Sequence, residues 1–235
     1  MLLLKNLTIS VSHKKIIKDF SYHFEAGKTY VIMGPNGSGK STLAFGIMGH
    51  PNYLISAGDI YFNKEKITTL TADKRAKRGL FMSFQSPLSL SGVTLFQLLK
   101  MALGKKIDPL CLKEDLEKKA KELDLKDDIL NRSLNDSTSG GEKKKIEVIQ
   151  AVILKPKFVI LDEIDTGVDV DALKKIANFL EKNKKNKTYV IITHYQRILR
   201  YLKADRVLVI NKGKLVKEGD AQLAVSIEKN GYTRL

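Results

Sequence analysis

The chain has 235 residues, of which 43% are hydrophobic and 29% are charged, as in an ordinary globular protein. No apolar run approaches the roughly 18 residues of a membrane-spanning helix, and the apolar start MLLL is too short for a signal peptide. We therefore expect a cytoplasmic protein without direct membrane insertion. The one cysteine, Cys111, excludes an internal disulfide, and the four scattered histidines lack zinc-site spacing.

The net charge of +15 comes almost entirely from lysine, because only seven of the 41 basic residues are arginine. A basic protein can bind nucleic acid or an acidic partner. Here the lysines are spread along the chain, and no cluster of aromatic or arginine residues accompanies them. This pattern favours a solvated, lysine-rich surface, and we expect no nucleic-acid partner.

The sequence before residue 63 predicts four strands, from apolar or alternating residues at Leu2–Val11, Ile16–Phe24, Thr29–Met33 and 58–62. A glycine-rich segment at 34–39 separates the third strand from a predicted helix at Lys40–Met48.

Residues 87–151 show no strand pattern. Apolar residues recur there at helical spacing among lysines and glutamates, at Leu112, Leu116, Ala120 and Leu123. We predict an inserted α-helical subdomain at 87–151. It interrupts a single domain of residues 1–235 whose α/β nucleotide-binding core is formed by 1–86 and 152–235.

The α/β pattern then resumes, with buried runs at Phe158–Leu161, Tyr189–Thr193 and Arg206–Ile210. An amphipathic helix is predicted at Asp171–Asn183, and the lysine-rich stretch 182–187 predicts an exposed loop. Buried runs that alternate with helices are typical of a mostly parallel sheet covered on both faces.

A phosphate-binding motif follows the third predicted strand, where G-x-x-x-x-G-K-[ST] is matched by Gly34-Pro35-Asn36-Gly37-Ser38-Gly39-Lys40-Ser41. The glycines permit a tight turn that surrounds phosphates with backbone N–H groups, and the helix N-terminus adds partial positive charge. We expect Lys40 to reach the β- and γ-phosphates, Ser41 to hold Mg²⁺ and Thr42 to bond another phosphate oxygen.

Two carboxylates stand where the buried run at Phe158–Leu161 ends. Asp162 has the position of a Mg²⁺-coordinating Walker B carboxylate, and Glu163 follows it directly. We expect Asp162 to hold the metal and Glu163 to act as the general base that polarises the attacking water.

A third motif lies at Ser139-Gly140-Gly141-Glu142. It matches the S-x-x-E capping box, with Ser139 as the N-cap and Glu142 bonding back. A capping box does not need two glycines. Here Gly140 and Gly141 leave bare N–H groups at the positive end of a helix, which is a surface suited to an anion.

With these motifs in order, the sequence resembles the ATP-binding cassette family over nearly its whole length. The five positions of the family signature LSGGQ are Thr138 to Glu142. Gln85 resembles the Q-loop glutamine, Thr166-Gly167-Val168-Asp169 the D-loop, and His194 the switch histidine that contacts the γ-phosphate. The resemblance implies the cassette fold of P-loop NTPases, a mostly parallel sheet with N-terminal antiparallel strands.

The resemblance also implies that two copies of the chain close head to tail around two ATP molecules. The signature residues Ser139, Gly140, Gly141 and Glu142 of one copy, with Asp169, would then face the nucleotide held by the other. Gln85 would take a catalytic and metal-contacting role, and His194 a catalytic one. Two departures stand out. Glu142 replaces the usual glutamine, and Val11 lies near the A-loop position where many cassettes stack an aromatic residue on adenine.

Finer details resemble the SufC family, the ATPases of the SUF iron–sulfur cluster assembly system. They lie in four stretches, at Gly79–Pro87, Ser139–Lys145, Leu161–Lys174 and Thr193–Leu199. This resemblance implies SufB- and SufD-like scaffold partners, or a SufB-like homodimer, that dock near the Q-loop and the helical insertion. ATP-driven closure would then reshape that scaffold.

Two alternatives remain from the residues alone. The generic motifs equally suit the ATPase subunit of a transporter. A DNA-repair or chromosome-type cassette is disfavoured, because such proteins carry a long coiled coil between the P-loop and the signature. The interval from Gln85 to Ser139 has room only for a small subdomain, and it shows no sustained heptads.

Overall fold

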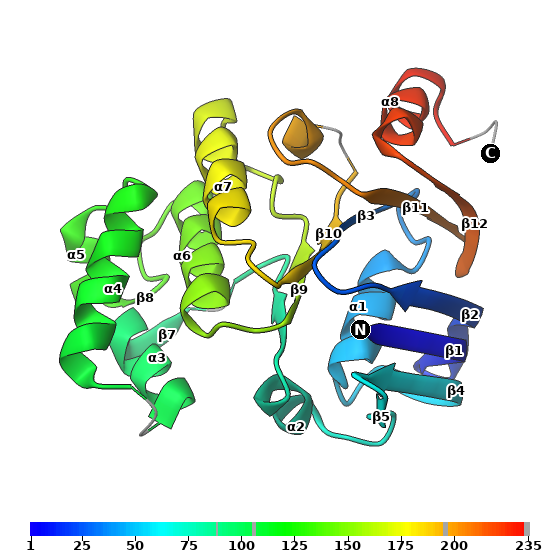
Figure 1. Ribbon diagram of the computed structural model, residues 1–235, viewed down its shortest axis with the longest axis horizontal. Helices are drawn as coiled ribbons and strands as arrows, with labels where there is room; N and C mark the ends of the chain where they lie inside the picture. The colour runs from blue at the N-terminus through cyan, green and yellow to red at the C-terminus, as the bar shows by residue number, and fades with distance from the viewer. Residues whose placement is uncertain (88, 105–106, 195–196, 233–235) are drawn as a thin grey trace. The chain divides into compact units, whose positions relative to one another are not determined.

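The computed structural model describes residues 1–87, 89–104, 107–194 and 197–232, and Figure 1 traces their order along the chain. The chain divides into two compact units. The first comprises Met1–Met82, Pro156–Glu163 and Lys184–Leu235, and the second comprises Ser83–Lys155 and Ile164–Asn183. The second unit therefore includes 164–183 in addition to the stretch 87–151 that the sequence predicts as an insertion.

The first unit contains a six-stranded sheet in the order β12-β11-β3-β10-β9-β6. In chain order its strands are β3 (Thr29–Met33), β6 (Leu80–Ser83), β9 (Phe158–Asp162), β10 (Thr188–Ile192), β11 (Arg206–Asn211) and β12 (Lys214–Gly219). β10 pairs in parallel with β3 and β9, and β11 pairs in parallel with β3. β12 pairs antiparallel with β11. The three central strands are buried along their whole length, as continuous apolar runs predict for a sheet covered on both faces.

A second, antiparallel sheet has the order β2-β1-β4-β5. Its strands are β1 (Leu2–Val11), β2 (Lys14–Phe24), β4 (Leu54–Phe62) and β5 (Glu65–Lys66). The prediction of a mostly parallel sheet with N-terminal antiparallel strands is confirmed. β4 begins four residues earlier than the predicted strand at 58–62, because 54–57 continue the pairing with β1.

Helix α1 (Lys40–Met48) contacts strands of both sheets in the first unit. Its buried Leu43, Ala44 and Ile47 belong to one core cluster with side chains from β1, β3 and β9. Two other helices of this unit are α2 (Ala72–Lys77) and α8 (Ala221–Asn230), and a short 3-10 helix, η2, spans Arg197–Arg200. α1 thus holds the loop that precedes it against a packed core.

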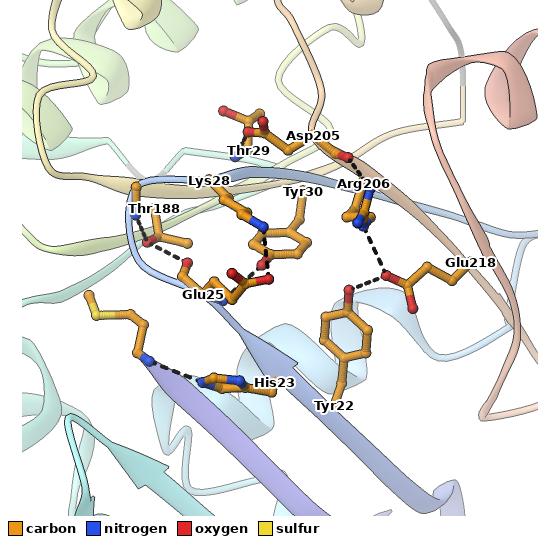
Figure 2. A network of polar contacts seen from close by, with 12 residues as sticks. Tyr22, His23, Glu25, Lys28, Thr29, Tyr30, Thr188, Asp205, Arg206 and Glu218 are labelled. Carbon is orange, nitrogen blue, oxygen red and sulfur yellow. Dashed lines mark hydrogen bonds and ion pairs between the residues drawn. The ribbon is translucent and has the colours of Figure 1, made fainter.

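Figure 2 shows a polar network around the end of β2 and the start of β3. The Tyr22 hydroxyl on β2 donates to Glu218 Oε1 on β12 at 2.8 Å, and Arg206 Nε lies 3.5 Å from the same oxygen. Burial, and then the bond to Glu218, raise the pKa of Tyr22. At the start of β3, the Thr29 N–H donates to Asp205 Oδ2 at 2.7 Å. These bonds connect β2 and β3 to the C-terminal strands.

The second unit is mainly helical, with α3 (Leu95–Leu103), α4 (Pro109–Glu122), α5 (Asp127–Asn131), α6 (Gly140–Ile153) and α7 (Val170–Lys182). The predicted apolar stripe on α4 is confirmed, since Leu112, Leu116 and Ala120 are buried. α4 begins where the sequence has two features that favour a helix start, an N-cap aspartate and a proline in the first turn. The Asp108 carboxylate accepts from the N–H groups of Leu110 and Cys111, and Pro109 occupies the first turn.

The prediction that 87–151 lacks strands is wrong at one place. β7 (Leu90–Thr94) pairs antiparallel with β8 (Ser133–Leu134), so that Leu90 lies opposite Leu134. β8 has two residues and β7 contains Gly92, so neither stretch carries a period-2 pattern long enough to recognise.

Within the described ranges, no helix has both the length and the apolar character needed to cross a membrane.

Candidate functional site

The sheet register brings three predicted site segments to one edge of the first unit. Ile192 on β10 lies opposite Ile32 on β3 and Asp162 on β9. Because the three strands are parallel, the residues that follow them leave the sheet at the same edge. These are the glycine-rich loop after β3, Glu163 after β9 and His194 after β10.

Two glycines of the loop at 34–39 lie very close to neighbouring strands, Gly34 to the backbone of β11 and Gly39 to a side chain of β2. A Cβ at Gly34, where φ is 156°, would lie 2.1 Å from the carbonyl oxygen of Ile210 on β11. A Cβ at Gly39, where φ is 106°, would lie 2.8 Å from Ile17 Cδ1 on β2. These two positions accept only glycine, so the glycine spacing of the motif is a requirement of the packing as well as of phosphate binding.

The N-terminus of α1 is open to an anion. Its N-cap is Gly39, which makes no side-chain capping bond, and the first turn contains no acidic residue. The Ser38 hydroxyl is buried at the same place, and among the residues that the structure describes it has no hydrogen-bond partner. Uncapped N–H groups, a positive helix end and an unpartnered hydroxyl together form a cradle that fits phosphate oxygens.

Lys40 lies across this cradle. It is 5% exposed, and its Nζ donates to the carbonyl oxygens of Gly34 at 2.9 Å and Pro35 at 3.1 Å. Burial lowers the pKa of Lys40, while the charges of Glu163 and then Asp162 act in the opposite direction. The Lys40 ammonium therefore interacts electrostatically with both predicted carboxylates.

The two carboxylates differ in their surroundings. Asp162 closes β9 and is fully buried, whereas the side chain of Glu163 is 12% exposed. Glu163 has a φ of 49°, unusual for a residue with a side chain, and its N–H donates to the Ile192 carbonyl at 2.9 Å. Its Oε1 lies 3.0 Å from Nε2 of His194. The sharp turn after β9 thus directs Glu163 toward the end of β10, where it contacts the predicted switch histidine.

The signature segment lies in the second unit, where the predicted capping box is confirmed. Ser139 Oγ accepts from the Glu142 N–H at 3.3 Å, and Glu142 Oε2 accepts from the Ser139 N–H at 2.8 Å. The bond from the Ser139 N–H lowers the pKa of Glu142. A Cβ at Gly141 would meet nothing within 4 Å, and Ser139 and Gly140 are exposed. The two glycines therefore leave the start of α6 accessible.

Two other predicted residues of the second unit also make bonds within the chain. Asp169 is the N-cap of α7, and its Oδ1 accepts from the Ala172 N–H at 2.8 Å. Gln85 is exposed, and its backbone carbonyl accepts from Lys144 at 3.0 Å. Their roles toward a nucleotide stay predictions. Tyr195 and Gln196, which belong to the stretch after His194, lie outside the described residues.

Sequence reasoning missed residues that contact the glycine-rich loop from far along the chain. The Gly34 N–H donates to the Tyr232 hydroxyl at 3.1 Å, and the Gly213 N–H donates to the Ser38 carbonyl at 2.9 Å. No motif marks either residue in the sequence. Near the expected A-loop position, Val11 lines a hollow of about 590 Å³ together with Phe45, His50 and Tyr53. The rings of Phe45 and Tyr53 stack there, with centroids 4.7 Å apart.

The chain is similar to known proteins over most of its length. The family model described as "ABC transporter" matches residues 17–166. A Guillardia theta protein described as a probable ATP-dependent transporter, ycf16, is 44% identical over 97% of this chain and 93% of its own length. A Streptococcus pyogenes serotype M3 protein described as a probable ABC transporter ATP-binding protein is 42% identical, over 97% and 92%. A solved nucleotide-free ATP-binding cassette from an ABC transporter has a TM-score of 0.80 at 26% identity, covering 100% of this chain and 98% of that one.

Proposed function

The chain belongs to the ABC transporter family, and we propose that it is the ATP-hydrolysing subunit of a SUF-type iron–sulfur cluster assembly complex. The contact between Glu163 and His194, beside an open P-loop helix, is the observation that supports hydrolysis in addition to nucleotide binding.

Each residue of this edge has a role that its geometry permits. Lys40 and the first turn of α1 bind the phosphates, and the Ser38 hydroxyl can donate to a phosphate oxygen. Glu163 accepts a proton from the attacking water, and His194 holds the Glu163 carboxylate at its working position. The buried oxygens of Asp162 and the hydroxyl of Ser41 suit Mg²⁺, which prefers oxygen ligands and would neutralise phosphate charge when bound.

A second copy of the chain completes the site in this proposal. One chain carries one P-loop and one signature, and the start of α6 is exposed with two glycines in its first turn. ATP held by one copy would receive the N–H groups of the other copy's Ser139-Gly140-Gly141 segment, where they stabilise developing negative charge. ATP binding would therefore drive dimerisation, and hydrolysis would release it.

The assignment to cluster assembly is supported by the resemblance to the SufC family in the stretches around Gln85, Ser139, Asp162 and His194. A chain with one cysteine lacks the thiolate ligands of a cluster scaffold, so the scaffold must be a partner. The second unit offers apolar surface for such a partner. Phe84 is 43% and Met101 79% exposed, and Met101 lines a hollow of about 750 Å³.

Copurification tests this assignment. The tagged chain is isolated from its native cell with Glu163→Gln as a second bait, because that variant should hold its complexes in the ATP-bound form. SufB- or SufD-like proteins should coelute, and the purified scaffold should raise ATP turnover. A Phe84→Ser, Met101→Ser variant should lose the stimulation but keep basal turnover. Retrieval of neither scaffold, or a scaffold without effect on turnover, would overturn the cluster-assembly assignment.

The second candidate function is the motor of a transporter. It is favoured by the descriptions of the relatives, which name an ATP-dependent transporter and an ABC transporter ATP-binding protein. Coelution of a polytopic membrane protein whose transport depends on Glu163 would establish that function, and it would leave the assignments at the P-loop edge unchanged.

A further inference from the structure

Helix α6 buries a charge pair outside the P-loop edge. Lys144 and Glu147 lie one turn apart and are 3% and 4% exposed, and Lys144 Nζ is 3.7 Å from Glu147 Oε2. Burying charged groups costs free energy unless bonds of good geometry compensate them, and aliphatic side chains would fill the same volume at less cost. The charges therefore call for a reason beyond packing.

Both side chains bind the backbone of the Q-loop. Glu147 Oε1 accepts from the Phe84 N–H at 2.8 Å. Lys144 Nζ donates to the Phe84 carbonyl at 2.9 Å and to the Gln85 carbonyl at 3.0 Å. The peptide groups on both sides of Phe84 are thus held by one turn of α6. All four residues belong to the second unit.

The same helix begins at the signature. Ser139 is the N-cap of α6, so Lys144 lies in the second turn after it. An α-helix is stiff over this length, and a displacement of its second turn moves its first turn as well. The chain also passes from the first unit to the second between Met82 and Ser83, directly before Phe84. The bound backbone therefore directly follows the first of the two points where the chain enters the second unit.

We propose that Lys144 and Glu147 are positioning residues that fix the Q-loop backbone to the signature helix. Gln85 and Ser139 would move as one body, so that contact of a partner with the exposed Phe84 ring reaches the start of α6. The proposal rests on the proposed function, which assigns Gln85 and Ser139 their roles. A purely structural anchor would stabilise the fold without coupling to Gln85.

A double-mutant cycle on ATP turnover separates the two roles. Lys144→Met should lower turnover about 10- to 100-fold and leave ATP affinity within about twofold, because small displacements of a catalytic group have effects of this size. In a Gln85→Ala background the same substitution should lower turnover less than about twofold. Lys144→Arg should restore part of the loss. Lys118→Met, which removes an exposed lysine of α4 in the same unit, serves as the matched control.

If Lys144→Met does not fold, a second variant can still test the proposal. Lys144→Met leaves the Glu147 carboxylate buried beside an apolar side chain, so Lys144→Met, Glu147→Met removes both charges. Hydrogen exchange of the Phe84 amide gives a readout independent of turnover. Exchange should rise at least tenfold in the double variant, while α4 amides keep their wild-type rates.

Unchanged exchange at Phe84, or turnover losses that multiply independently with Gln85→Ala, would overturn the positioning role. Absence of ATP hydrolysis by the wild-type chain would instead overturn the proposed function. In that case the exchange measurement would still decide whether Lys144 and Glu147 hold the Q-loop backbone.

Discussion

His194 Nε2 lies 3.0 Å from Glu163 Oε1, although 31 residues separate the two in the chain. The contact follows from the parallel pairing of β9 and β10, which aligns Asp162 with Ile192 and lets the next residues meet at the sheet edge. Glu163 also turns sharply there, with its N–H bonded to the Ile192 carbonyl. The carboxylate assigned to activate water is thus held through its backbone and through its side chain.

The contact predicts how His194 acts. In His194→Ala the Glu163 carboxylate loses its contact with the imidazole, so turnover should fall about 10²-fold, within the range of a positioned acid–base system. ATP affinity should change only a few-fold, because Lys40 and α1 keep the phosphate cradle. Steady-state turnover and nucleotide titration measure the two effects. His23→Ala, which removes an exposed histidine of β2, is the control, and a His194→Ala enzyme as active as this control would contradict the assignment.

The pKa of Lys40 predicts a pH dependence of nucleotide affinity. Burial lowers this pKa below the value of an unfolded lysine, so the charged ammonium opposes folding at pH values below the folded pKa. This penalty declines as pH rises from the folded pKa to the unfolded pKa, because the folded state has by then lost the proton that the unfolded state still holds. Phosphate binding needs the charged form. ATP affinity should therefore be constant near neutral pH and fall as pH rises through the lowered pKa.

Titrations of ATP between about pH 7 and 10 test this prediction. Lys40→Arg is the comparison, because a guanidinium keeps its charge over the whole range. Its affinity, whatever its absolute value, should not decline with pH. Parallel profiles for the wild type and Lys40→Arg would mean that Lys40 does not cause the decline.

The buried hydrogen bonds of Arg75 are expected to stabilise the folded chain. This residue of α2 is 1% exposed, and its guanidinium donates to the carbonyl oxygens of Thr68, Leu70, Gly46 and Ile47. Burial lowers its pKa to about 10, which leaves it charged at neutral pH. Arg75→Met removes the donor of four backbone carbonyl groups, two of them in the last turn of α1. The free energy of unfolding should therefore fall by about 3 kcal/mol or more.

Urea unfolding measures this loss, with Arg78→Met as the control. Arg78 binds Glu65 at the surface, where an ion pair contributes at most about 1 kcal/mol. Equal losses in the two variants would contradict the role of Arg75 at the end of α1.

Sequence reasoning located the P-loop edge because its residues follow buried strands, and the ends of parallel strands converge in space. It also predicted the capping box of Ser139 and Glu142, which depends only on neighbours in the chain. It could not find Tyr232 or Gly213, because their bonds to the glycine-rich loop depend on how the C-terminal segment packs. Lys144 and Glu147 were hidden for another reason. On a helix rich in lysine they read as solvent-exposed residues, and only burial distinguishes them.

Glu163→Gln gives the most direct test of ATP hydrolysis at this edge. The amide keeps the size of the side chain but cannot accept the proton of the attacking water. ATP affinity should stay within a few-fold of the wild type, turnover should fall about 10²-fold or more, and light scattering should show an ATP-dependent dimer. Near-normal turnover in this variant, measured beside unchanged ATP binding, would remove Glu163 as the general base and contradict the proposed site.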